Sequence, residues 1–137
     1  MRYFIEIVFN GKNYHGWQIQ PNAPSIQENL TKTLSTILRT DINLVGAGRT
    51  DAGVHATQLF AHFDVDIVID ENDLLQKLNS FLPEDIVIKK IFLVNKDSHA
   101  RFDAVSRSYE YRILLGRDPF LLDTTWQLHN RHLDINK

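Results

Sequence analysis

The amino-acid sequence predicts an α+β domain with a ferredoxin-like fold: a split βαββαβ order that forms an antiparallel sheet with both helices on one face. Two observations support this. Hydrophobic residues switch between a period of two and a period near 3.6, in the order strand, helix, strand, strand, helix, strand. Capping residues also mark two helix starts. The second face of such a sheet is left free, and it is where folds of this kind bind RNA.

The first three expected elements follow directly from the pattern. Residues 2–9 alternate between apolar and polar side chains, with Tyr3, Ile5, Ile7 and Phe9 on one face. A loop containing Gly and Pro covers residues 11–24. Ser25 then begins a helix, because Glu28 stands three residues later and completes a capping box. Residues 42–45 are expected to form the second strand.

The remaining elements of the first domain are a strand, a helix and a strand. Residues 58–65 are expected to form the third strand. Asp70 and Asp73 form a second capping pair that opens a short helix. Residues 86–94 are rich in β-branched side chains and supply the fourth strand.

A second unit is expected after this domain. We expect the first domain to cover residues 1–105, and residues 106–137 to begin a second half with a long central strand over 106–115. Asp134 is placed to cap a new helix only three residues before Lys137. We therefore expect the sequence to be a truncated piece of a longer protein.

Composition narrows the class of protein. The chain has 137 residues, enough for a hydrophobic core, and it has no cysteine for disulfides or thiolate metal sites. The absence of a leader or long apolar run predicts a cytoplasmic protein without a membrane segment. A net charge of −2 argues against nucleic-acid binding over the whole surface, so any RNA contact must come from a local patch. Cationic candidates are Arg49, Arg101, Arg107, Arg112 and Arg117.

The segment over residues 45–56 is the most informative for chemistry. Glycines and small residues surround Arg49 and Asp51, and small residues let a base or a polymer approach the backbone closely. A nearby cation favours the ionised carboxylate, which can then act as a nucleophile or an electrostatic stabiliser. By itself, an Arg-x-Asp spacing is more often a tight turn with a surface ion pair.

Other interpretations of this segment fit less well. It lacks the Gly-Lys-Ser/Thr ending of a phosphate-binding loop, and a strand follows it where a dinucleotide fingerprint needs a helix. A metal site from Asp51, His55 and His62 would need a helix to bring the first two together, and we expect no metal. Asp64 or Asp66 could serve as the second acid of a glycosidase-like pair, but nothing in the sequence marks either residue.

Aromatic residues give a second signal, because unstacked RNA bases lie on aromatic side chains. Tyr109 and Tyr111 would share a strand face with Arg107, although core packing is the commoner role of such residues. Tyr14 and Trp17 lie in the first loop, where a core position is harder to explain.

Five motifs spread along the chain together resemble the tRNA pseudouridine synthase A family. They are Gly-x-x-Tyr-x-Gly-Trp-Gln at 11–18, Ser-Ile-Gln-Glu at 25–28, Gly-Arg-Thr-Asp-Ala-Gly-Val-His at 48–55, His-Ala-Arg-Phe at 99–102 and Arg-Ser-Tyr-Glu-Tyr at 107–111. The resemblance implies that Asp51 is the catalytic nucleophile. It implies that Arg49 pairs with this carboxylate and helps to hold the flipped-out nucleotide. It also implies that Tyr109 packs against the target uracil and is a candidate for the later proton abstraction.

The resemblance further implies an isomerase that converts uridine to pseudouridine in the anticodon stem and loop of tRNA, without a cofactor. Candidate substrate-binding residues are Tyr14, Trp17, His55, Arg101 and Arg107. Family members are about twice this length, and their second half completes a cleft in a homodimer that binds tRNA across both subunits. A chain that holds only the first half is expected to be inactive.

Two non-enzymatic alternatives remain. One is an RNA-binding module, because the ferredoxin-like order is shared with RNA-recognition motifs and a fold does not determine a function. Residues 58–63 lack the glycine and the leading basic residue of the aromatic motif in such modules. The other alternative is a structural or interaction domain, which would leave the glycine-rich segment without a role.

Overall fold

The structure is a computed structural model that describes residues 1–114, 117–121 and 124–127. The chain divides into two compact units, Met1–Val105 and Ser106–Lys137. Each unit is described below by itself. No helix in the described part of the chain is both long enough and apolar enough to cross a membrane.

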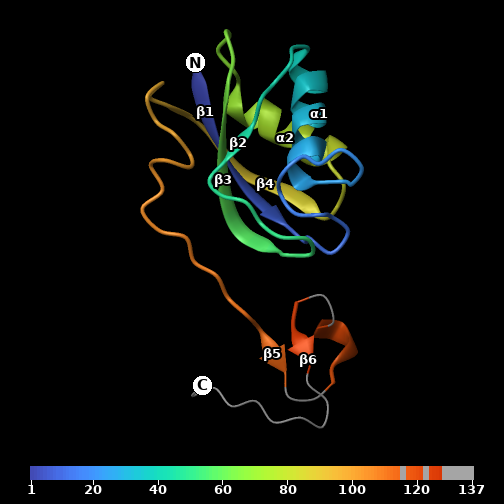
Figure 1. Cartoon of the computed structure of the whole chain (residues 1–137). Helices are drawn as coiled ribbons and strands as arrows, with labels where there is room; N and C mark the ends of the chain where they lie inside the picture. The colour runs from blue at the N-terminus through green and yellow to red at the C-terminus, as the bar shows by residue number, and fades with distance from the viewer. Residues whose placement is uncertain (115–116, 122–123, 128–137) are drawn as a thin grey trace. The chain divides into compact units, whose positions relative to one another are not determined.

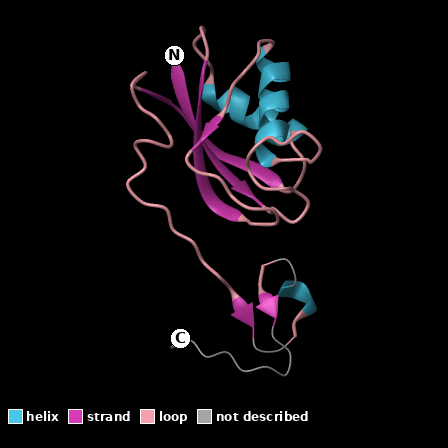
Figure 2. Ribbon diagram, in the orientation of Figure 1, coloured by secondary structure: helices cyan, strands magenta, loops and turns pink. Residues whose placement is uncertain are grey.

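The first unit is a four-stranded sheet with two helices on one face, as Figures 1 and 2 show. Its elements are β1 (Arg2–Phe9), α1 (Ile26–Leu38), β2 (Val45–Gly46), β3 (Ala56–Asp64), α2 (Glu71–Phe81) and β4 (Ile86–Val94). The strand order is β2-β3-β1-β4, and every neighbouring pair is antiparallel. This order and the two helices confirm the predicted ferredoxin-like fold.

Alternation along β1 separates the two faces of the sheet. Its odd-numbered residues, Tyr3 to Phe9, are buried and face the helices, while the even-numbered ones are only half-buried. The core between sheet and helices is completed by Leu30 and Leu34 from α1 and by Leu74 and Leu78 from α2. Because β1 is the central strand, its apolar face is covered along its whole length.

Ser25 and Asp70 are confirmed as the residues that cap the two helices. The Ser25 hydroxyl accepts a hydrogen bond from the Glu28 amide at 3.2 Å, and the Asp70 carboxylate accepts one from the Asp73 amide at 3.1 Å. These side chains satisfy backbone amides that the first turn of a helix leaves without partners.

The second strand is shorter and later than predicted. Only Val45 and Gly46 pair with β3, whereas residues 42–44 form no strand. Ile42 and Leu44 are nevertheless buried in the core. Their alternation therefore reports burial on one side of an extended segment, and it does not report strand pairing.

The second unit contains only short described elements. The strand β5 (Ile113–Leu114) pairs in parallel with β6 (Trp126–Gln127), and a 3-10 turn, η1 (Pro119–Leu121), lies between them in sequence. The long strand predicted over residues 106–115 is not formed, because residues 106–112 carry no regular structure and are exposed. The helix expected at Asp134 lies outside the described residues.

Candidate active site

The glycine-rich loop between β2 and β3 is fixed by its backbone and leaves its charged side chains exposed. At the β2 end, the Ala47 amide donates to the Phe60 carbonyl at 2.8 Å. The Val54 amide donates to the Asp51 carbonyl at 3.2 Å and closes a tight turn. The side chains of Arg49 and Asp51 are both exposed. The loop therefore presents these side chains on a fixed backbone.

The loop after β1 lies directly against this turn. The Gly53 amide donates to the Tyr14 carbonyl at 3.1 Å, and the Trp17 amide makes a longer bond of 3.4 Å to the Thr50 carbonyl. Gly16 has a φ of 83°, and a Cβ atom there would lie 2.2 Å from the Thr50 carbonyl oxygen. Only glycine fits such a backbone conformation and such a close approach. The two loops thus touch through their backbones on both sides of Asp51.

A second close contact joins Gly11 to the far end of the same turn. A Cβ atom at Gly11 would lie 2.0 Å from the Val54 carbonyl oxygen. The Gly11 amide donates to Nδ1 of His55 at 2.9 Å. Because Nδ1 accepts this hydrogen bond, the neutral His55 ring carries its proton on Nε2. His55 therefore fastens the loop after β1 to the start of β3.

Tyr14 and Trp17 both belong to the core, contrary to the expectation from their position in a loop. Their exposed fractions are 7% and 2%. The Trp17 indole packs under Gly46, where a Cβ atom would lie 2.7 Å from the indole Nε1. The Tyr14 hydroxyl donates to Oδ1 of Asp85 at 2.7 Å. Burial, followed by this hydrogen bond, raises the pKa of Tyr14 above its usual value, so the hydroxyl remains a donor.

Gln27 is a functional support that the sequence analysis did not single out. It is buried at the start of α1, where its side-chain amide donates to the Leu44 carbonyl at 2.7 Å and accepts from the Ile19 amide at 3.0 Å. Its own backbone amide donates to the Trp17 carbonyl at 3.0 Å. One side chain therefore ties together the helix, the first loop and the segment leading into β2. In the sequence, Gln27 is marked by its place in the capping segment at residues 25–28.

The charged pair of the loop is not closed in this structure. Among the residues described, no ion pair within 4.0 Å joins the Arg49 guanidinium to the Asp51 carboxylate. Both side chains instead project from a backbone that is hydrogen-bonded to the loop after β1 at Thr50 and at Gly53. Chemically, the loop offers an accessible carboxylate with a cation two residues away. Such a carboxylate can act as a nucleophile toward a substrate that brings its own electrophilic carbon.

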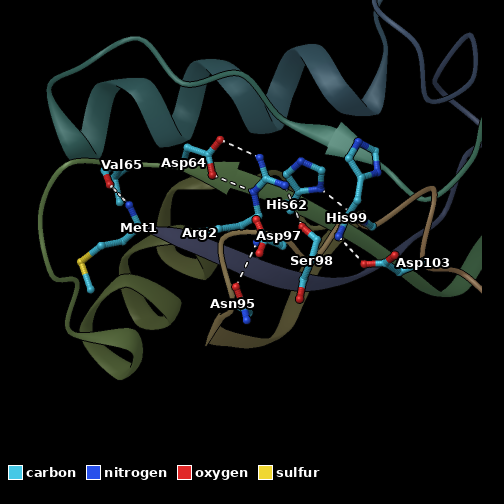
Figure 3. Close-up of polar contacts among 11 residues, drawn as sticks. Met1, Arg2, His62, Asp64, Val65, Asn95, Asp97, Ser98, His99 and Asp103 are labelled. Atoms are coloured by element: carbon cyan, nitrogen blue, oxygen red, sulfur yellow. Dashed lines mark hydrogen bonds and ion pairs between the residues drawn. The ribbon is translucent and has the colours of Figure 1, made fainter.

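A second cluster fastens the segment after β4 to the sheet face opposite the helices (Figure 3). The Arg2 guanidinium donates to both oxygens of Asp64, at 2.8 and 3.0 Å, and to the Ser98 carbonyl at 2.7 Å. The hydrogen bond from Arg2 lowers the pKa of the Asp64 carboxyl. These bonds hold Ser98 close to the end of β3 at Asp64.

His62 and His99 fix the following turn. Nδ1 of the buried His62 accepts from the Ala100 amide at 3.0 Å, and Nδ1 of His99 accepts from the Arg101 amide at 3.1 Å. Burial, followed by the nearby Arg2 and His99, lowers the pKa of His62 to about 4. The His99 ring meets the His62 ring edge-on and stacks on the Phe102 ring.

No family model matches the sequence of the chain, but curated proteins do. It is 53% identical over 119 residues to tRNA pseudouridine synthase A of Bacteroides thetaiotaomicron, covering 87% of this chain and 44% of that protein. It is 50% identical to the tRNA pseudouridine synthase A of Bacteroides fragilis, covering 99% of this chain and 54% of that protein. The protein of that name from Acinetobacter baylyi is also 50% identical, with 99% and 51% covered.

The chain belongs to the tRNA pseudouridine synthase A family. It spans about half the length of the curated relatives it matches. The family resemblance drawn from the five motifs is therefore confirmed. The roles that this resemblance gives to individual residues stay predictions.

The structure brings together five of the eight residues that the family resemblance singles out. The five around the glycine-rich loop are Arg49, Asp51, His55, Tyr14 and Trp17. Arg101 is exposed on the turn after β4, in the same unit. Arg107 and Tyr109 belong to the second unit, where Tyr109 is 67% exposed. The described residues contain no group of three or more potential metal ligands.

Proposed function

We propose that the complete protein is a tRNA pseudouridine synthase that isomerises uridine in the anticodon stem and loop of tRNA, with Asp51 as its nucleophile and without a cofactor. The names and high identity of the relatives support the reaction class. Support for the nucleophile comes from one observation. Asp51 is exposed at a turn whose backbone is bonded on both sides, through Thr50 and Gly53.

The reaction explains why such a carboxylate is needed. The bond between ribose C1′ and uracil N1 breaks, the base rotates, and C1′ joins to C5 of the same base. C5 then loses its hydrogen as a proton and N1 gains a proton, so the composition of the nucleotide is unchanged. An ionised carboxylate can add to uracil C6, or act at ribose C1′, or take a proton from C2′ to form a glycal. All three routes require an accessible carboxylate whose position relative to its target is set to within a fraction of an ångström.

The other predicted site residues take roles that fit their exposure. The target uridine leaves the helix stack at a cost of a few kcal/mol, and Arg49 is exposed beside Asp51 to hold the flipped nucleotide. Arg101 and Arg107 contact the RNA, and Tyr109 packs against the uracil. Tyr14 and Trp17 are buried, so they enter this proposal as supports of the loop and not as surfaces for a base.

The proposal extends to the complete protein and its partners. tRNA is the substrate, and the protein acts in the cytoplasm as a homodimer in which a second half completes the cleft. Residues 1–137 alone, with only part of that cleft, should show no turnover. Turnover by this piece alone would show that the missing half supplies nothing essential.

The test is tritium release from 5-tritiated uridine in unmodified tRNA, because joining C1′ to C5 expels the hydrogen at C5. We expect the complete protein to release tritium, and Asp51→Ala and Asp51→Asn to reduce release by at least about 10³-fold, which is the scale on which loss of a nucleophile acts. Both variants should still bind tRNA. Asp41→Asn is the matched control, because Asp41 is also an exposed loop carboxylate of this domain.

Two results would contradict the proposal. Full turnover by Asp51→Asn would show that Asp51 is not the nucleophile. No release from a folded complete protein that binds tRNA would instead favour the RNA-binding module.

A further inference from the structure

We propose that Tyr14 and Asp85 are positioning residues for Asp51: their side-chain hydrogen bond ties the loop after β1 to the start of β4 and so sets the place of the glycine-rich turn. This inference rests on the proposed function. It adds a residue, Asp85, that lies 71 positions from its partner and that no motif in the sequence marks.

The first step is that the loop after β1 determines where the Asp51 turn lies. The Tyr14 carbonyl accepts the Gly53 amide at 3.1 Å, and the Trp17 amide bonds to the Thr50 carbonyl at 3.4 Å. These contacts lie on either side of Asp51. A displacement of residues 14–17 therefore displaces the backbone from which the carboxylate projects.

The second step is that Tyr14 is itself anchored by Asp85. Its hydroxyl donates to the Asp85 carboxylate at 2.7 Å, a short distance typical of a charge-assisted bond. The Asp85 carbonyl accepts the Asn10 amide at 2.9 Å, so one residue holds both the beginning and the middle of the loop. Asp85 stands directly before β4, the neighbour of β1 in the sheet. The anchor is therefore the turn residue that leads directly into the sheet.

The third step concerns the size of the effect. Tyr14 is 7% exposed and Asp85 is half-buried, so water can only partly replace a lost bond between them. If Tyr14 loses its hydroxyl, the Asp85 carboxylate loses this hydrogen-bond donor, and the loop loses its side-chain bond to the residue before β4. A misplacement of about 1 Å from a change remote from the chemistry can cost about 10²-fold in rate. Tyr14→Phe should therefore act on turnover more than on substrate binding.

The chain offers a matched control in Tyr3. Its side chain is 1% exposed, and its hydroxyl accepts a hydrogen bond from the Ile69 amide at 3.0 Å. Tyr3→Phe thus removes a buried tyrosine hydroxyl and one hydrogen bond from the same domain. Ile69 lies next to Asp70, the N-cap of α2, and among the residues described it forms no hydrogen bond with either loop.

The experiment uses the complete protein and two readouts. The first is kcat and KM for tritium release from tRNA. The second is hydrogen exchange at the Gly53 amide, which reports the contact with Tyr14 whether or not the protein is active. We expect Tyr14→Phe and Asp85→Ala to lower kcat at least tenfold with KM within twofold, and to speed exchange at Gly53. Asp85→Asn keeps an acceptor oxygen, so most of the kcat and most of the protection of the Gly53 amide from exchange should be retained.

Tyr3→Phe should destabilise the protein to a similar degree, yet leave kcat and Gly53 exchange within twofold of the unsubstituted protein. Equal losses of kcat in Tyr3→Phe and Tyr14→Phe, or unchanged Gly53 exchange in Tyr14→Phe, would overturn the positioning role. Failure of the unsubstituted protein to release tritium would refute the proposed function separately, because the exchange measurement would still test the tie to β4.

Discussion

Two irregular segments are attached to the same sheet by opposite means. The glycine-rich turn around Asp51 is held through main-chain atoms and by close approach of glycines such as Gly11 and Gly16. The segment 98–103 is held chiefly by side chains, among them Arg2 and His62. In the first segment the charged side chains project outward. In the second, the side chains of His99 and Asp103 accept hydrogen bonds from backbone amides of the segment itself.

The difference indicates which segment is built to present chemistry. A side chain that fastens the backbone cannot also react with a substrate, whereas a backbone held by its own amides and carbonyls leaves every side chain available. Glycine is the residue that permits such holding, because two backbones approach without an intervening Cβ. The turn at Asp51 has this construction, and the turn at His99 does not.

The largest expected effect comes from breaking the close backbone approach. In Gly16→Ala, the new Cβ would lie 2.2 Å from the Thr50 carbonyl oxygen at a φ of 83°, so the loops must separate. We expect the free energy of unfolding, measured by urea denaturation, to fall by more than about 2 kcal/mol. Gly53→Ala is the matched control, because Gly53 has a similar φ of 79° but open space around it. It should cost only about 1 kcal/mol. Equal costs would show that crowding does not hold the loops together.

A smaller effect is expected from the side-chain fastening at His62. Its pKa falls from about 6.5 in the unfolded chain to about 4 in the folded protein, chiefly because burial disfavours the charged ring; Arg2 and His99 also oppose this charge, and Asp64 favours it. As the pH falls, the unfolded state therefore takes up a proton on His62 at a higher pH than the folded state does. The stability due to neutral His62 is complete above pH 6.5 and is lost as the pH falls toward 4, by at most about 1.4 kcal/mol per pH unit.

The check is urea denaturation at several pH values between 7 and 4.5. His62→Asn keeps an acceptor near the position of Nδ1 but cannot take up a proton. Its unfolding free energy should therefore depend less steeply on pH than that of the unsubstituted protein. Identical slopes would show that His62 is not the residue that titrates in this range.

The smallest effect on stability is expected where the proposed effect on activity is greatest. The side chains of Arg49 and Asp51 are exposed, and neither forms an ion pair with another residue in the described part of the chain. Arg49→Ala and Asp51→Ala should each change the free energy of unfolding by less than about 0.5 kcal/mol, measured by thermal or urea denaturation. A loss above about 1 kcal/mol from either variant would mean that these side chains help to hold their own loop.

Much of the fold could be predicted because its signals are local. The alternation in β1 and the capping side chains of Ser25 and Asp70 act within a few residues. Strand pairing is not local. Ile42 and Leu44 alternate as a strand does, and so do residues 106–112, yet neither stretch has a strand beside it in the described structure. A sequence pattern reports which side of a segment is apolar, but a strand also needs a partner.

The site could be predicted in part for the same reason. The segment around Asp51 is marked by its own composition. Tyr14 and Trp17 were misplaced, because an aromatic side chain in a loop looks the same in sequence whether it fills the core or faces solvent. Asp85 could not be found, since the bond to Tyr14 depends on how the loop folds back over the start of β4.

The burial of Trp17 makes the glycine-rich loop optically visible. The chain has two tryptophans, and Trp17 is the one whose indole lies under Gly46 and whose amide meets Thr50. With Trp126→Phe, the emission spectrum of the chain would come from Trp17 alone. A red shift of that spectrum would mean that water has reached the ring, which would record the parting of the two loops in real time and without a label.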